Sequence, residues 1–569
     1  MGIGGTRDRQ CRRTVTKMTR VFWLKWLAVA CASKAAGVVR VLVLVGVFAG
    51  LPGGLAGAAE SLVLLARPGP WSAVSGLIGY GGRLWFVNGV LFVNHNSADV
   101  YSYDPATGAA RHETHLFSQN AGDPTVAGGL LYWPFEDPRS STGRGEFMVT
   151  DGEQWSWHLL PEGQAFHVHA MLSHENTLYA ATSAWRAGLQ RSDDGGRTWR
   201  ILYDHTQAPG TVSRFTTLAT LGGRLYAGLT NWSRSGIKLF RVGQEGVAPV
   251  VTWPEGLAVT ALTAFQGWLY GVQHGESESV LWRTDGDRAQ SIAGFEGARV
   301  RDLAATDDGL WAVSVRTDGG DLWSSPDGVT WTLRQSFEGV QPTELAVYGG
   351  HVYMGAIGPG EHGSLWGPPP PAPAEVEEIP LPLVTPGRVE GKDVDAALDA
   401  LDGALAAGEG FSRDGEGLRG AVRAVARYGG RAIGEALAAR LANSGPDTPV
   451  KLFGGNVEVP AATLGQWYLL WGMAYSGSGR VPTGLLTAPW DQPRNRAEKY
   501  MEPAPLAMWA AARLGQDDAT TVGALVDTLG RPGDPAWLDG DRVGALTALT
   551  DRRFAYDFAA WRAWWASRH

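Results

Sequence analysis

The sequence predicts a multidomain β + α protein in which small antiparallel sheets, repeated around a ring, precede an all-helical domain. Three observations predict this fold: a repeat of about 45 residues across residues 60–366, hydrophobic alternation of period two inside each repeat, and hydrophobic steps of three and four residues near the C-terminus. The chain has 569 residues, which is too long for one ordinary domain. A hydrophobic fraction of 44% with 19% charged residues excludes a wholly disordered chain.

Residues 1–58 have the pattern of a secretory signal peptide. Nine Lys or Arg residues and a single acid precede an apolar run from Val41 to Leu51, and small residues end the segment at Ala56-Gly57-Ala58. A cleaved signal peptide and a retained N-terminal membrane segment both fit this pattern. We therefore expect a secreted, periplasmic or cell-surface protein that contacts a membrane only through an uncleaved leader.

Charge and cysteine content exclude several classes of function. The leader takes nine of the 49 basic residues and one of the 57 acidic ones, so the remaining chain holds 40 and 56 and has a net charge of −16. Such an acidic protein does not attract a phosphate backbone, and we expect no nucleic-acid partner. Cys11 and Cys31 both lie in the leader, which leaves no thiol for a disulfide, a metal site or a nucleophile. No P-loop or dinucleotide-binding glycine motif is present, and we expect no cofactor.

The repeated unit is a tight turn followed by an apolar–aromatic pair. The pair occurs seven times, as Leu84-Trp85, Leu131-Tyr132, Leu178-Tyr179, Leu225-Tyr226, Leu269-Tyr270, Leu310-Trp311 and Val352-Tyr353. Alternation of period two around each pair is typical of short strands joined by tight turns. Four short strands per unit, repeated radially, predict a seven-bladed β-propeller over residues 60–366.

The ring must also close. The seventh unit offers about three strands, around 343–348, 351–357 and 364–366, before proline-rich sequence begins. We predict that the apolar run from Glu60 to Ala66 supplies the missing outer strand of the last blade. The alternative is that this run belongs to the leader.

Four units carry an aspartate–glycine pair at the same place, 15 to 19 residues after the aromatic. We name them the Asp–Gly turns: Asp151-Gly152, Asp194-Gly195, Asp285-Gly286 and Asp327-Gly328. In such a turn the carboxylate accepts backbone N–H groups and glycine permits positive φ. Ser192 to Trp199 matches S-x-D-x-G-x-T-W and resembles the Asp-box of sialidase-like and photosystem-assembly-factor-like propellers. The resemblance implies that these boxes stabilise the blades and lie opposite the ligand-binding face.

The connections on the other face carry aromatic and charged residues. Aromatic and arginine side chains around a concave mouth suit a glycan or a peptide. Our candidates for ligand binding are Trp185, Arg186, Trp232, Arg234, His274, Glu276 and His169.

Ionisable residues at the starts of the innermost strands are candidates for catalysis. They are Asp123, Asp302, Glu344, Arg214 and Arg301. The sialidase resemblance implies three arginines that hold a carboxylate, a Tyr–Glu nucleophile pair and an acidic Asp. The Arg-Ile-Pro signature of that family is missing, so no catalytic set is assigned. Hydrolysis of a glycoside would require two of these carboxylates roughly 5–10 Å apart.

His167-Val168-His169 is the one spacing that suggests a metal. Alternation places both imidazoles on one side of an inner strand, as in some Zn and Cu sites. No third ligand follows from spacing, and we predict no metal.

Residues 367–390 form a proline-rich linker, and residues 391–569 have helical periodicity. The candidate helices are 394–401, 418–441, 461–475, 497–514, 519–529, 541–549 and 557–567. Residues 505–567 resemble bacterial HEAT-like helical repeats, with Ala507 to Val526 as one helix pair. The resemblance implies a surface that binds a protein partner.

Two recognition modules in tandem favour a non-catalytic binding or scaffold protein that recognises a glycan or a protein through the loop face of the propeller. The first alternative is a sialidase-like glycoside hydrolase acting at the propeller mouth. The second is an assembly factor for a membrane complex.

Overall fold

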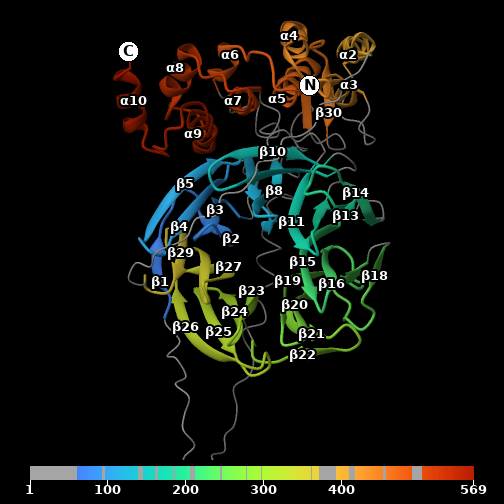
Figure 1. Ribbon diagram of the computed structural model, residues 1–569, viewed down its shortest axis with the longest axis vertical. Coiled ribbons are helices and arrows are strands. Elements are labelled where there is room, and N and C mark those ends of the chain that lie inside the picture. The colour runs from blue at the N-terminus through green and yellow to red at the C-terminus, as the bar shows by residue number, and fades with distance from the viewer. Residues whose placement is uncertain are drawn as a thin grey trace, which may run out of the picture. The chain divides into compact units, whose positions relative to one another are not determined.

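The computed structural model describes residues 61–91, 97–138, 145–160, 165–183, 186–205, 212–243, 246–276, 279–295, 298–360, 362–370, 393–408, 417–452, 457–489 and 503–568. All of them belong to one compact unit, residues 59–569. The trace divides into a strand region and a C-terminal helical region (Figure 1).

The strand region begins with three antiparallel sheets whose strands follow one another along the chain. The first sheet contains β2 (Ala73–Tyr80), β3 (Arg83–Gly89), β4 (Asp99–Asp104) and β5 (Ala109–His115). The second contains β6 (Ser118–Ala121), β7 (Thr125–Ala127), β8 (Leu130–Pro138), β9 (Glu146–Thr150) and β10 (Trp155–Leu159). The third contains β11 (His167–His174), β12 (Thr177–Ser183), β13 (Ala187–Ser192) and β14 (Arg200–His205).

A sheet of eight strands follows, and it consists of two runs of four. The first run is β15 (Arg214–Leu221), β16 (Arg224–Thr230), β17 (Leu239–Val242) and β18 (Val247–Pro249). The second run is β19 (Ala258–Phe265), β20 (Trp268–His274), β21 (Ser279–Thr284) and β22 (Ala289–Ile292). A single residue pair, Thr230 with Ala258, joins the two runs.

The last two sheets complete the strand region. One contains β23 (Arg299–Thr306), β24 (Gly309–Arg316), β25 (Gly319–Ser325) and β26 (Thr332–Glu338). The other contains β27 (Gln341–Tyr348), β28 (His351–Ile357), β29 (Gly363–Gly367) and, from the far end of the chain, β1 (Val63–Ala66).

The pairing of β1 with β29 closes the ring. Val63 lies opposite Gly367 and Leu64 opposite Trp366 in antiparallel register. Leu62, next to β1, is fixed on both sides because its N–H donates to Gln335 Oε1 at 2.8 Å and its carbonyl accepts from Gln335 Nε2 at 3.0 Å. The prediction that the run from Glu60 to Ala66 supplies an outer strand to the last sheet is therefore confirmed.

In Figure 1 the strands β2, β11, β15, β19, β23 and β27 lie nearer the middle of the ring than β5, β14, β18, β22, β26 and β1. Radial antiparallel sheets with short edges are the architecture of a β-propeller. A β-bulge interrupts six of the inner strands, β2, β11, β15, β19, β23 and β27. These bulges break the period-two alternation near the axis of the ring.

The Asp–Gly turns make the contacts that their sequence predicts. Asp194 Oδ1 accepts the N–H of Thr198 at 2.9 Å, and Trp199 Nε1 donates to the carbonyl of Gly196 at 3.0 Å. Asp327 Oδ1 accepts the N–H groups of Val329 and Thr330 at 2.8 and 2.7 Å. These bonds hold the pKa of both aspartates below the usual value although burial acts in the opposite direction.

The helical region contains several short helices and one small hairpin. They are α2 (Val394–Ala407), α3 (Leu418–Ala426), α4 (Arg431–Arg440), the hairpin β30 (Pro449–Leu452) and β31 (Val457–Pro460), α5 (Ala461–Ser476), α6 (Thr483–Leu486), α7 (Pro503–Arg513), α8 (Ala519–Thr528), α9 (Ala536–Thr550) and α10 (Phe558–Ala566). Gly429 and Gly430, both at positive φ, separate α3 from α4. Within the described ranges, each helix is too short or too polar to cross a lipid bilayer.

The helical region packs directly on the first two sheets. One hydrophobic cluster unites buried side chains of the strand region, such as Trp133 and Trp157, with the helical core. The rings of Trp157 and Trp509 meet edge to face at 5.3 Å. Helix α9 approaches β5 so closely that a Cβ on Gly544 would lie 2.5 Å from the Cβ of His115. Only glycine fits there without a shift of the helix.

A buried polar network crosses this contact, and we name it the Asp99 network: Asp99, His112, His115, Asp541 and Tyr556. His115 bonds to Asp99 at 3.0 Å through Nδ1 and to Asp541 of α9 at 3.2 Å through Nε2. Tyr556 donates to the second oxygen of Asp99 at 2.7 Å. Burial opposes the charge on His115, but the two carboxylates outweigh it and raise the pKa of His115 to about 9. The imidazolium thus links the two regions.

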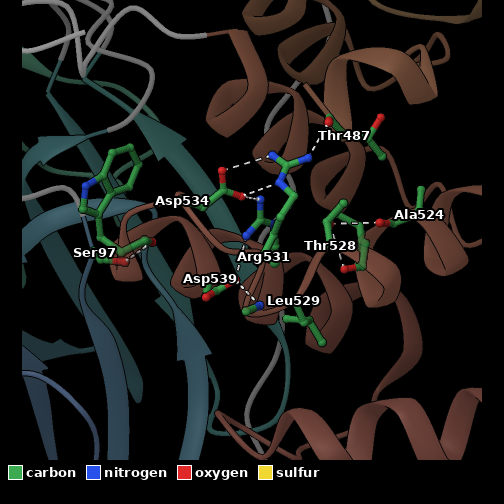
Figure 2. Close-up of polar contacts among 12 residues, drawn as sticks. Ser97, Thr487, Ala524, Thr528, Leu529, Arg531, Asp534 and Asp539 are labelled. Atoms are coloured by element: carbon green, nitrogen blue, oxygen red, sulfur yellow. Dashed lines mark hydrogen bonds and ion pairs between the residues drawn. The ribbon is translucent and has the colours of Figure 1, made fainter. Parts of the chain in front are cut away.

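Further charged residues form ion pairs within α9 and with the residues just before it. The guanidinium of Arg542 is fully buried and bonds to Asp534 and, at 2.7 Å, to Asp539. Figure 2 shows Arg531 between Asp534 and Thr487, whose carbonyl accepts from Arg531 Nη1 at 2.8 Å. In the same view Ser97 of the strand region donates to the carbonyl of Trp537 at 3.0 Å.

These contacts predict that stability falls at alkaline pH. The pKa of His115 is raised from 6.5 to about 9, so its contribution is complete below pH 6.5 and is lost as the pH rises through about 9. The contribution is on the order of 3 kcal/mol. Denaturant unfolding between pH 6 and 10 should show a decline for the wild type and a flatter profile for His115→Gln.

The matched control is His351→Gln, because His351 is an exposed histidine of the strand region. This variant should keep the wild-type profile. Parallel profiles for wild type and His115→Gln would show that the network does not stabilise the contact.

Candidate ligand-binding site on the inner strands

Four carboxylates gather where the inner strands begin, and we name them the acidic cluster: Asp123, Glu136, Asp302 and Glu344. Two of them directly follow a bulge, Asp302 in β23 and Glu344 in β27. Each accepts backbone N–H groups from the next inner strand of the ring. Asp302 Oδ2 accepts from Leu345 at 2.8 Å, and Glu344 accepts from Gly76 at 2.5 Å and from Leu77 at 3.0 Å.

The cluster carries raised pKa values. Burial, followed by the charges of Asp123 and Asp302, raises the pKa of Glu344 well above its usual value. Burial raises the pKa of Asp302 to about 6, although its two N–H bonds act in the opposite direction. Carboxylates that share a poorly hydrated site cannot all ionise at low cost. The cluster therefore holds protons near neutral pH.

Asp123 is exposed, whereas Glu136, Asp302 and Glu344 are half-buried. The main chain of Asp123 is hydrogen-bonded to the neighbouring sheet. Its N–H donates to the carbonyl of His169 at 2.8 Å, and its carbonyl accepts from the N–H of Met171 at 3.0 Å. Partial loss of hydration, together with the charges of Asp302 and Glu136, raises the pKa of Asp123 to about 7. A carboxyl group with these properties can donate or accept a proton near neutral pH.

Two histidines and an arginine lie beside Glu136. The rings of His167 and His169 stack at 5.2 Å, and His169 Nε2 bonds to Ser183 Oγ at 2.8 Å. Glu136 Oε1 lies 3.7 Å from His169 Nδ1 and 3.8 Å from Arg214 Nη1. Burial lowers the pKa of His167 to about 4 and that of His169 well below its usual value, so both imidazoles are neutral. No group of three or more ligating side chains suited to a metal occurs in the described parts of the chain.

An exposed tryptophan lies on a buried histidine at the mouth of the ring. Trp232 is 51% exposed, and its ring is 5.1 Å from that of His274. Both nitrogens of His274 are engaged, by Thr260 Oγ1 at 2.9 Å and by Ser279 Oγ at 2.6 Å. Burial, with the charges of Arg299 and Arg301, lowers the pKa of His274 to about 4.

Arg299 and Arg301 are therefore close to this ring, and we name Trp232, His274, Arg299 and Arg301 the aromatic–arginine cluster. Burial, followed by the neighbouring charge of Arg299, lowers the pKa of Arg301 to about 10. Arg301 is half-buried and Arg299 is exposed, and two neighbouring guanidiniums favour the approach of ligand oxygens.

The remaining candidates lie at the surface or outside the described residues. Arg186 is exposed and pairs with Asp204 at 2.9 Å, and Arg234 and Glu276 are also exposed. Trp185 lies outside the described residues. Of the proposed ligand-binding residues, the structure thus brings Trp232 together with His274, and it places His169 in the acidic surroundings of Glu136.

Sequence reasoning did not select Arg299, and it placed Glu136 only among the charged connections of the ligand-binding face. Arg299 and Arg301 are two positions apart in β23, so the alternation of a strand was an available signal. Glu136 lies near the end of the long strand β8, opposite Asn120 of β6, and no spacing in the sequence reveals its approach to the other carboxylates.

Comparisons with known proteins identify no family for this chain. No family model matches it, and no curated protein matches it. Among solved structures it is similar to the β-propeller domain of the Trilobed protease from Pyrococcus furiosus, with 10% identity and a TM-score of 0.38 over 52% of this chain and 96% of that one. The WD40 β-propeller domain of Doa1 is similar at 11% identity and a TM-score of 0.37, over 54% of this chain and 96% of that one. Similarity at this level says nothing about a ligand.

Substitution of Glu344 tests whether its hydrogen bonds stabilise the ring. Glu344→Ala leaves the N–H groups of Gly76 and Leu77 without their acceptor and should lower the free energy of unfolding by about 1–3 kcal/mol. Glu344→Gln keeps a carbonyl acceptor and should cost less. Because the raised pKa of Glu344 makes its ionisation unfavourable in the folded state, Glu344→Gln should also reduce the loss of stability above pH 4.5.

Chemical denaturation at pH 5 and pH 8 measures both effects. Wild-type stability of Glu344→Ala would show that these hydrogen bonds do not hold the ring together.

Proposed function

We propose that this protein is a non-catalytic binding or scaffold protein that recognises a glycan or a protein ligand at the mouth of the ring. The aromatic–arginine cluster is the observation that carries the proposal. Trp232 offers a half-exposed ring to a sugar face or an apolar side chain, and its ring contacts that of His274. Arg299 and Arg301 supply hydrogen-bond donors near His274.

The hydrogen bonds that the carboxylates make favour a binding function over glycoside hydrolysis. Asp302 and Glu344 direct their oxygens to backbone N–H groups of neighbouring strands. A retaining or inverting glycosidase needs two carboxyl groups that both face the substrate. Asp123 is the member of the acidic cluster that best fits a general acid, because it is accessible and its pKa is raised to about 7.

The number of blades, the nature of the Asp–Gly turns and the type of helical array are part of the same proposal. We take the sheets as seven blades, with the two runs β15–β18 and β19–β22 as separate blades, and the Asp–Gly turns as Asp-boxes of a sialidase-like propeller. We take the helical region as a HEAT-like array that offers a protein-binding surface. The pattern of the leader supports secretion or retention at the cell envelope.

Glycan and peptide arrays probed with the full chain test this function. Trp232→Ala should weaken binding of the selected ligand by about 30-fold, which corresponds to the ~2 kcal/mol of a typical interface hot spot. The matched control is Leu333→Ala, which removes a side chain that is 48% exposed on the outer strand β26 and should leave binding unchanged. Wild-type affinity of Trp232→Ala would place the ligand elsewhere.

The alternative function, a glycoside hydrolase acting through Asp123, has its own test. Asp123→Asn removes the titrating proton and should leave ligand binding intact if the protein only binds. Release of product from a panel of glycosides by the wild type, lost in Asp123→Asn, would instead establish hydrolysis.

A further inference from the structure

A second exposed apolar side chain, that of Val212, lies at the mouth of the ring near Trp232. Trp232 is 51% exposed and Val212 is 58% exposed. Asn231 directly precedes Trp232, and Val212 directly precedes Ser213. The two backbone segments are joined because Asn231 Nδ2 donates to Ser213 Oγ at 2.7 Å, and both of these polar residues are buried. Two exposed apolar side chains thus occupy neighbouring positions of the rim.

The polar groups next to Trp232 are hydrogen-bonded within the protein. Asn231 Oδ1 accepts from the hydroxyl of Ser233 at 3.0 Å, and both ring nitrogens of His274 are bonded to hydroxyl groups. The guanidiniums near His274 are donors only. A sugar hydroxyl needs an acceptor for its own proton when a binding site removes it from water. This surface therefore favours an apolar side chain flanked by acceptor groups over a pyranose ring.

Arg299, the first residue of β23, supplies a positive charge that no acid balances among the described residues. Its side chain is exposed, and partial loss of hydration is the one cause that lowers its pKa. Arg301 differs, because Asp302 follows it and offsets part of its charge. The charges that shift the pKa of His274 are those of the two arginines. The positive potential beside His274 thus depends chiefly on Arg299.

The overall charge of the chain does not prevent an acidic ligand from binding here. The formal net charge is −8, but exposed charges more than about 8 Å apart are largely screened at physiological ionic strength. Glu276 is exposed and lies two residues beyond His274, yet it is not among the charges that shift the pKa of that imidazole. A ligand carboxylate near His274 is therefore attracted by the guanidiniums.

We propose that the ligand is a segment of a protein in which a large apolar side chain stands next to one or more acidic residues. The apolar side chain packs on Trp232 and Val212, and a carboxylate of the segment binds Arg299. This inference rests on the proposed function, because it names the class of ligand for the same site. Tryptophan and arginine are the residues that most often carry the binding energy of protein interfaces.

Fluorescence polarisation of the full-length protein with three peptide pools tests the proposal. Every peptide has a central leucine, phenylalanine or tryptophan, which is flanked by aspartate in the first pool, by asparagine in the second and by lysine in the third. The aspartate pool should bind about tenfold more tightly than the asparagine pool, because its contact with a guanidinium is charge-assisted, and the lysine pool should bind most weakly. The difference should shrink as salt rises from about 0.05 M to about 0.5 M.

Substitutions at the rim assign each part of the contact. Arg299→Gln should remove the preference for the aspartate pool and leave the asparagine pool bound as before, and Arg299→Lys should restore part of that preference. Trp232→Ala should weaken the binding of both pools. The matched control is Glu276→Gln, which removes an exposed charge at the same rim and should not weaken the aspartate pool. All of these variants should keep the wild-type thermal midpoint, which verifies that they are folded.

Equal binding of the aspartate and asparagine pools, or a preference for aspartate that survives Arg299→Gln, would overturn the inference. Binding of a glycan that is lost in Trp232→Ala, with no binding of any peptide pool, would overturn it as well, although the mouth of the ring would remain the ligand-binding site. Failure of the proposed function has a different signature, because neither glycans nor peptides would then bind in a way that depends on Trp232.

Discussion

The structure depends on hydrogen bonds that join the two ends of the ring. A ring of sheets is stable only if the last sheet contacts the first, and the entropy of closing so long a loop must be offset by those contacts. The chain makes these contacts at both the outer and the inner edges of the sheets. On the outside β1 pairs with β29, and on the inside Glu344 accepts the N–H groups of Gly76 and Leu77, at a sequence separation of 268 residues for the first. Thr343 adds a bond from its hydroxyl to the carbonyl of Val74 at 2.5 Å.

These hydrogen bonds between inner strands explain why carboxylates gather near the axis of the ring. At a bulge the backbone N–H groups of an inner strand lose their ladder partners and need other acceptors. Carboxylate oxygens from the preceding sheet supply them, as Glu344 does for Gly76 and Leu77 in the bulge of β2. As a result, several acidic side chains lie where water hydrates them poorly, and their pKa values are raised. A raised pKa at this position reflects assembly of the ring and is by itself no sign of catalysis.

The sequence predicts the parts of the fold that depend on local pattern. Period-two alternation and the apolar–aromatic pairs locate the strands, and the need to close the ring identifies the run that becomes β1. The Asp–Gly turns follow from residue types alone. The interdomain contact could not be predicted in the same way, because His115 and Asp541 are 426 positions apart and neither belongs to a motif. The bonding of Asp302 and Glu344 was also beyond prediction, since it arises from bulges that break the alternation.

A departure from the repeat locates the proposed binding site. A residue that occurs in every unit serves the packing of the sheets, so it has little freedom to serve a ligand. The run β15–β18 departs from the repeat because Trp232 leaves a large ring exposed in the connection between β16 and β17. This ring forms a platform at the mouth of the ring of sheets, beside the buried imidazole of His274. Because sheet packing does not require an exposed indole at this position, contact with a ligand is the most direct physical reason for it.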